Sequence, residues 1–84
     1  MSMKAVTKTL ATTDAETLTE TAYYTQRVTL QAASTNTGEV LVGDSAAQVM
    51  RLTAGEAIDL YPDKAGDVYV KGTPNDVVNA LIYC

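Results

Sequence analysis

The 84-residue sequence contains no histidine, and its one cysteine is Cys84. Histidine and activated cysteine supply most nucleophiles, general bases and transition-metal ligands, because both titrate or ligate near neutral pH. A single cysteine also rules out a disulfide within the chain, the usual support of a small secreted domain. The sequence therefore predicts a protein that is not an enzyme, with no catalytic residue, metal or cofactor, made in a reducing compartment such as the bacterial cytoplasm.

Phenylalanine and tryptophan are also absent, so the core must come from aliphatic residues, methionine and five tyrosines. A chain of this length encloses one modest core, and such small domains often need a further source of stability. We expect a single domain stabilised as a homo-oligomer, a trimer or a dimer. No apolar run is long enough to span a bilayer and residues 1–13 lack a secretory signal pattern, so we expect no membrane contact.

The formal net charge of −4 comes from one part of the chain. Residues 1–34 balance three basic against three acidic side chains, whereas residues 35–84 hold three basic and seven acidic ones. Nucleic acid is bound through a basic stripe that neutralises phosphates, and no such stripe is present. We expect no direct nucleic-acid binding, and we interpret the acidic part as solvated surface.

The chain is rich in short β-branched runs that are closed by Gly, Pro, Asn, Asp or Ser, the pattern of strands joined by turns. Apolar and polar residues alternate within these runs; Val28 and Leu30, for example, flank Thr29. The pattern predicts an all-β fold: a small antiparallel sandwich or jelly-roll-like barrel of about seven strands, paired mostly through hairpins. The predicted strands are residues 4–10, 26–33, 39–43, 48–52, 56–61, 67–71 and 77–83.

Residues 1–25 differ from the rest, because they are threonine-rich and contain no Gly or Pro. Thr13 and Glu16 match a capping box, and Leu18 and Ala22 follow at helical spacing, which favours a short helix from about Asp14. The threonines favour an extended chain instead, since β-branched side chains lose freedom in a helix. We interpret residues 1–25 as an arm or edge segment beside a core of residues 26–84. In the extended form residues 4–10 add to a sheet edge of their own chain or of a neighbour.

The last predicted strand has two apolar faces, because Asn79 is the only polar residue in 77–83. Something must cover the second face. One possibility is the other sheet's overhang or the folded-back arm, and the other is a contact between subunits. We expect the arm, this strand and a tyrosine anchor to make the contacts with partners. These residues are Met3, Val6, Leu10, Tyr23, Tyr24, Val77, Leu81 and Tyr83.

Asp59, Asp63 and Asp67 surround a Pro/Gly-containing loop. Paired carboxylates perform acid–base chemistry in glycosidases, and carboxylate and carbonyl oxygens bind calcium. The chain is too small to enclose a sugar cleft, and the spacing matches no EF-hand or comparable calcium loop. We interpret the loop as an exposed acidic turn that aids solubility, with calcium as the open alternative.

Four segments, residues 28–32, 36–45, 52–56 and 68–72, resemble small all-β virion proteins of tailed bacteriophages, some of which are capsid decoration or cement proteins. The two motifs that carry the resemblance are N-T-G-x-V-x-V-G, for a strand, turn and strand, and L-x-A-G-E, for a further turn. Their residues are Asn36, Thr37, Gly38, Val42, Gly43, Gly55 and Glu56.

The resemblance implies a sandwich or jelly-roll-like oligomer that binds the major capsid protein on the virion head surface and stabilises the shell. Two alternatives remain open. One is another virion component, such as a head–tail, tail or head spike protein. The other is a free-standing β-module that binds a carbohydrate or peptide ligand.

Overall fold

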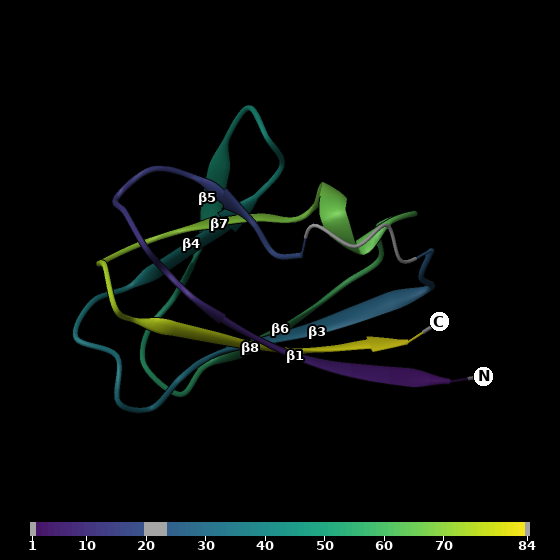
Figure 1. Cartoon of the computed structure of the whole chain (residues 1–84), viewed down its shortest axis with the longest axis horizontal. Coiled ribbons are helices and arrows are strands. Elements are labelled where there is room, and N and C mark those ends of the chain that lie inside the picture. Colours follow the sequence, from purple (N-terminus) through teal and green to yellow (C-terminus); the bar gives the residue numbers. More distant parts are fainter. Residues whose placement is uncertain (1, 20–23, 84) are drawn as a thin grey trace.

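The computed structural model describes residues 2–19 and 24–83, and these form two layers of strands (Figure 1). Sheet A has the strand order β1-β8-β3-β6 and sheet B the order β2-β7-β4-β5. A short 3₁₀ turn, Ala65–Asp67, joins β6 to β7. The strands are β1 (Met3–Thr9), β2 (Glu16–Thr17), β3 (Arg27–Ala32), β4 (Val40–Gly43), β5 (Gln48–Leu52), β6 (Ala57–Leu60), β7 (Tyr69–Lys71) and β8 (Val77–Tyr83).

The predicted all-β, antiparallel architecture is confirmed, with two open sheets and not a closed barrel. Each of the seven predicted runs overlaps one strand, and the described residues hold one strand more, β2. β2 lies where the alternative helix from Asp14 was expected, so that helix is wrong for residues 14–19. Glu16 accepts hydrogen bonds from the backbone of Ala11 and Thr12, and β2 pairs with β7 instead of coiling.

The expectation that hairpins make most of the pairings is also wrong. Among the described strands only β4 and β5 are consecutive partners, and every other connection passes from one sheet to the other. The pairs are β1 with β8, β2 with β7, β3 with β6 and β4 with β5, so β1 to β4 run as one long ribbon against β8 to β5. Each sheet holds two of these pairs side by side, joined through β3–β8 in sheet A and through β4–β7 in sheet B. Turn-forming residues mark where a strand ends, but they do not specify which sheet receives the next strand.

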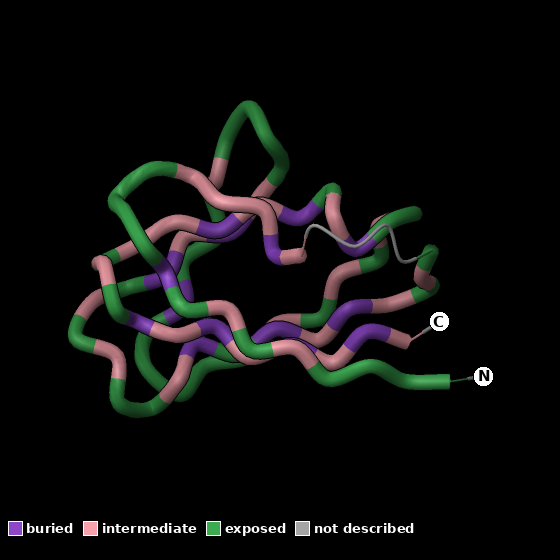
Figure 2. The backbone as a smooth tube through the Cα atoms, in the orientation of Figure 1, coloured by how far each residue is buried: buried purple, intermediate pink, exposed green. Residues whose placement is uncertain are grey.

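The core lies between the two sheets, where buried positions of both layers face each other (Figure 2). Alternate residues of β3, β4 and β8 are buried, as the period-two pattern predicts. Ile58 and Leu60 are only partly buried, because β6 lies at a sheet edge. The buried hydrophobic residues are Leu10, Leu18, Val28, Leu30, Ala32, Val40, Val42, Leu52, Ala65, Val68, Val70, Val78, Ala80 and Ile82.

The N-terminal segment belongs to this same core. β1 pairs with β8 of its own chain along its whole length, from Met3 opposite Tyr83 to Thr9 opposite Val77. The extended form of the segment is therefore the one observed. Leu10, expected to contact a partner, is fully buried, so that expectation is wrong: its side chain fills the space between the sheets.

Asp76 is the buried charged residue of the described chain, with 5% of its surface exposed. Its carboxylate accepts hydrogen bonds from the backbone N–H groups of Thr37 (3.0 Å) and Gly38 (2.9 Å) and from the Thr37 hydroxyl (3.1 Å). Asn36 both donates to the Val77 carbonyl and accepts from the Val77 N–H, each at 2.8 Å. The N-T-G motif therefore binds the β7–β8 corner, in addition to turning the chain before β4.

The β1 end joins the same cluster. The Leu10 N–H donates to the Asp76 carbonyl at 2.9 Å, and the Asn75 N–H donates to the Leu10 carbonyl at 2.8 Å. Three segments distant in sequence thus meet at Asp76, one through its carboxylate and one through its backbone. The hydrogen bond from the Thr37 backbone, supported by that from Gly38, holds the pKa of Asp76 below its ordinary value.

Two motif glycines stand where another residue would be strained, Gly43 for lack of space and Gly55 because of its backbone conformation. A Cβ on Gly43 would lie 2.0 Å from the Ala47 carbonyl oxygen, at the irregularity where the β4–β5 register shifts. Gly55 has a φ of 87°, and Glu56 beside it accepts a hydrogen bond from the Thr53 N–H at 2.7 Å. The L-x-A-G-E motif thus forms the corner through which β5 passes to β6.

We predict that Asp76→Asn lowers the melting temperature on the order of 5 to 10 °C at neutral pH, since an amide cannot replace the carboxylate as acceptor of all three bonds. Because the folded-state pKa is lowered, the carboxylate stabilises the fold above the ordinary pKa and that stabilisation is lost as the pH falls through the folded value. The melting curves of the wild type and the variant should therefore converge as the pH falls below 3.8. Thermal denaturation followed by circular dichroism measures this.

Asp14→Asn is the matched control. Asp14 is exposed, so this substitution should change the melting temperature of the protein little. An Asp76→Asn variant as stable as the Asp14→Asn control would contradict the role given to this cluster.

A candidate interaction surface on sheet A

Sheet B covers one side of sheet A, and no described segment covers the other side (Figure 1). Residues directly opposite each other in the register form rows across this outer side. The middle row runs Ala5, Leu81, Thr29, Asp59 from β1 to β6. We call the outward-pointing residues of β1, β8, β3 and β6 the sheet A face.

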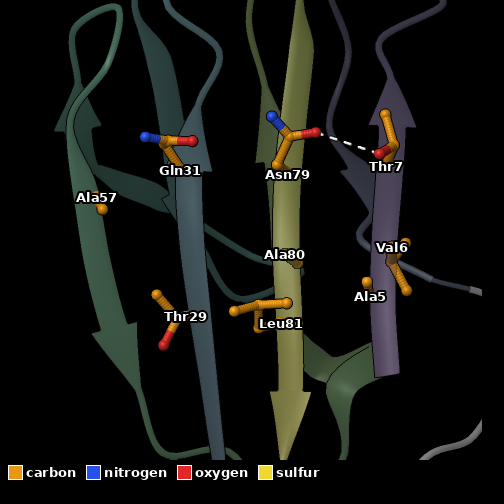
Figure 3. Close-up of a pocket in the computed structure, with 9 residues that line it drawn as sticks. All are labelled: Ala5, Val6, Thr7, Thr29, Gln31, Ala57, Asn79, Ala80 and Leu81. Atoms are coloured by element: carbon orange, nitrogen blue, oxygen red, sulfur yellow. Dashed lines mark hydrogen bonds between the residues drawn. The ribbon is translucent and has the colours of Figure 1, made fainter. Parts of the chain in front are cut away.

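Two further rows flank the middle one. Thr7, Asn79, Gln31 and Ala57 lie on one side of it, as Figure 3 shows, and Met3, Tyr83 and Arg27 lie on the other. Arg27 and Asp59 are the charged residues of the three rows. A sheet surface exposed to water usually carries many more charges than this, so the composition indicates an interface.

A shallow hollow of about 390 Å³ lies on the sheet A face around Leu81. It exists because the neighbours of Leu81 in the middle row, Ala5 and Thr29, are small. Figure 3 shows the Leu81 side chain between those two residues. A protruding apolar side chain of a partner fits such a depression.

The polar groups on this face pair with one another. The Thr7 hydroxyl donates to the Asn79 side-chain oxygen at 3.2 Å, and the Thr29 hydroxyl donates to the Asp59 carboxylate at 2.7 Å. A polar group with a partner in its own chain loses less when water is removed. Removing water from the sheet A face therefore costs less free energy than its number of polar residues suggests.

A second hollow, of about 440 Å³, continues the face at the C-terminal end of β8. It is lined by Gln26, Arg27, Tyr61 and Tyr83, with the Arg27 guanidinium carbon 4.3 Å from the centre of the Tyr83 ring. This geometry is a cation–π contact. Tyrosine and arginine are the residue types most often found at the energetic centres of interfaces.

The structure brings half of the predicted contact residues together. Met3, Val77, Leu81 and Tyr83 all lie on the sheet A face, since Met3 opposes Tyr83 and the other three alternate along β8. The expected cover by a folded-back arm or by the overhang of the other sheet is wrong for the described residues. β1 lies beside β8 and not across it, and the second face of β8 stays half-buried. A contact between subunits remains the prediction.

The other predicted contact residues lie elsewhere. Val6 points inward and packs against the core, like Leu10. Tyr24 is 71% exposed, forms an isolated bridge with Lys64 and stacks near the ammonium of that residue at 5.5 Å. Tyr23 lies outside the described residues, so its part of the prediction has no structural counterpart.

Sequence reasoning missed the middle of the face: Ala5, Thr29, Gln31 and Ala57. Their signal was present, because the outward faces of β1 and β3 carry Ala5, Thr7, Thr29 and Gln31, and Arg27 is the one charged residue among them, where a solvated strand usually carries more charges. These residues can be recognised as one surface only when the strand order is known, because it places the faces side by side.

Asp59, Asp63 and Asp67 do not all lie at one site in the structure. Among residues 2–19 and 24–83, no group of three or more Asp, Glu, His or Cys side chains is arranged to hold a metal ion. Asp59 lies on the sheet A face, whereas Asp63 and Asp67 line a different hollow. In the described parts of the chain no helix has the length and apolar character required to cross a membrane.

We predict that Leu81→Ala and Ile82→Ala lower the free energy of unfolding by different amounts although the residues are adjacent. Ile82 is fully buried between the sheets, so its truncation should lower the free energy of unfolding by about 2–5 kcal/mol. Leu81 is half-buried on the open face, so its truncation should lower the free energy of unfolding by about 1–2 kcal/mol. Urea denaturation of both variants measures the difference. Equal losses would contradict the assignment of the two faces.

Comparison with protein-family models, with curated proteins and with solved structures finds no match for this chain. The function is therefore inferred from the sheet A face and the fold that presents it.

Proposed function

We propose that this protein is a structural protein of a bacteriophage virion, a capsid decoration or cement protein that binds the head shell and stabilises it. The observation that carries the proposal is the sheet A face: an open sheet surface with a central leucine, a tyrosine–arginine end and few charges. The partner is the major capsid protein, and the location is the head surface of a virion assembled in the bacterial cytoplasm. The role needs no catalytic group.

We further propose that the two sheets form an eight-stranded jelly roll. The strand orders β1-β8-β3-β6 and β2-β7-β4-β5 support this, because wrapping one long antiparallel ribbon, in which β1 to β4 pair with β8 to β5, over itself produces that arrangement. Jelly rolls are frequent in viral capsid domains, which supports a virion role by analogy of fold. The quoted sequence motifs, which resemble small phage virion proteins, support the same class independently.

The physics of a repeating shell suits such a surface. Each copy contributes a modest contact, and an oligomer of two or three copies engages neighbouring capsid subunits at once, which raises its avidity without any new contact. The net charge of −4 keeps the free protein soluble, while the sparsely charged sheet A face can be dehydrated at little cost.

Two alternatives differ from the proposal in measurable ways. A head–tail, tail or spike protein would be present in a few copies per virion. A free-standing ligand-binding module is favoured by the hollow at Arg27, Tyr61 and Tyr83, and it predicts a stable monomer that binds a glycan or peptide there. Light scattering and a glycan array test that alternative.

The proposal predicts that virions contain this protein in a copy number that tracks the major capsid protein. When purified protein is added to heads that were assembled without it, the Leu81→Glu variant should bind at an occupancy at least about tenfold lower than that of the wild type. The reason is that burying an unpaired carboxylate at the centre of an interface is costly. Quantitative mass spectrometry of purified particles measures both quantities.

The matched control is Ala46→Glu, which adds the same charge at an exposed position in the turn between β4 and β5 of sheet B, away from the sheet A face. It should leave the occupancy unchanged, and circular dichroism should show both variants folded. A handful of wild-type copies per particle, or full occupancy by Leu81→Glu, would refute the proposal.

A further inference from the structure

A third hollow, of about 420 Å³, lies where β5 and β6, the edge strands of the two sheets, leave the space between the layers open. Its volume is typical of ligand-binding pockets. We call it the edge groove. Its floor contains Val42 and Val68, which are buried members of the core, so whatever enters the groove contacts the core directly.

The walls of the edge groove are unusually apolar for a surface. Val49 is 72% exposed, Met50 50% and Tyr61 73%, and all three line the groove. Among the described residues these are three of the five large hydrophobic side chains that are exposed to this extent, the others being Met3 and Tyr24. An apolar cluster left in water in this way marks an interaction site.

The rim of the groove carries uncompensated negative charge. Asp44, Asp63 and Asp67 line it, and no lysine or arginine does. Four cations of the described chain are engaged elsewhere: Lys8 with Glu16, Arg51 with Glu39, Arg27 with the Tyr83 ring and Lys64 with the Tyr24 ring. Charge complementarity therefore selects a cationic partner.

The backbone beside the groove favours an extended partner. β5 pairs only with β4 among the described strands, so its other side is open to an added strand. Alternate side chains of an added strand point between the two sheets, toward the apolar floor. β1, the opposite edge of sheet A, carries Lys4 and Lys8, which discourage such an addition there.

We propose that the edge groove binds an extended polypeptide segment of a partner protein, in which an apolar side chain stands next to lysine or arginine. The apolar side chain enters between Met50 and Tyr61 onto Val42 and Val68. The cation reaches the carboxylate of Asp63 or Asp67. The inference goes beyond the capsid role and does not depend on it.

Selection of random twelve-residue peptides displayed on phage, against the immobilised full-length protein, tests this. Enriched peptides should carry Lys or Arg beside an apolar residue, and a synthetic copy of one should bind in solution by calorimetry. The double variant Asp63→Asn/Asp67→Asn should weaken that binding about fivefold or more, and raised salt should weaken binding to the wild type more than to the variant. Met50→Ser should weaken it by a similar factor through lost apolar contact.

The matched control is Glu56→Gln with Asp14→Asn, which removes the same amount of charge from exposed positions that do not line the groove and pair with no cation of the described chain. This control should bind the peptide as the wild type does. No enrichment over bare support, enrichment of acidic peptides, or equal binding by all variants would overturn the proposal. So would self-association in light scattering that Met50→Ser abolishes, since the occupant would then be a second copy. Binding of the Leu81→Glu variant to the peptide stays intact, which separates this test from that of the capsid role.

Discussion

The buried carboxylate of Asp76 is the point on which the arrangement of the chain depends. The carboxylate accepts hydrogen bonds from Thr37 and Gly38, and the backbone carbonyl of Asp76 accepts one from the N–H of Leu10 at the end of β1. Burying a charge is costly unless it is hydrogen-bonded, and here the three donors to the carboxylate come from a segment about 40 residues away in the sequence. The corner at Asp76 thereby sets β8 between β1 and β3, and that position creates the sheet A face.

The same strand order explains why two different surfaces remain open. The central strands are enclosed by their neighbours, but no segment of the described chain lies on the outer side of sheet A, and the edges at β5 and β6 leave the edge groove beside the core. A chain this short lacks the residues to cover both layers. Its unburied apolar area is thus a consequence of size, and association with partners is the physical means of covering it.

The two surfaces differ in character, and so do the partners that they suit. The sheet A face is broad, with internally paired polar groups, and it suits a flat protein surface. The edge groove is narrow and apolar with an acidic rim, and it suits one extended strand with a positive charge. A protein that joins larger assemblies gains from having both, because two contacts that are engaged together give a higher overall affinity than either contact alone.

The sequence by itself determined the fold class, the positions of seven strands and most of the core, because alternation and turn residues are local properties of a strand. It also marked Leu81 and Tyr83 as apolar residues with no place in the core. Only the tertiary structure decided the strand order, the inward position of Leu10 and the partners of Asn36 and Asp76. Those depend on pairings such as Met3 with Tyr83, and no local pattern encodes a contact between residues so far apart.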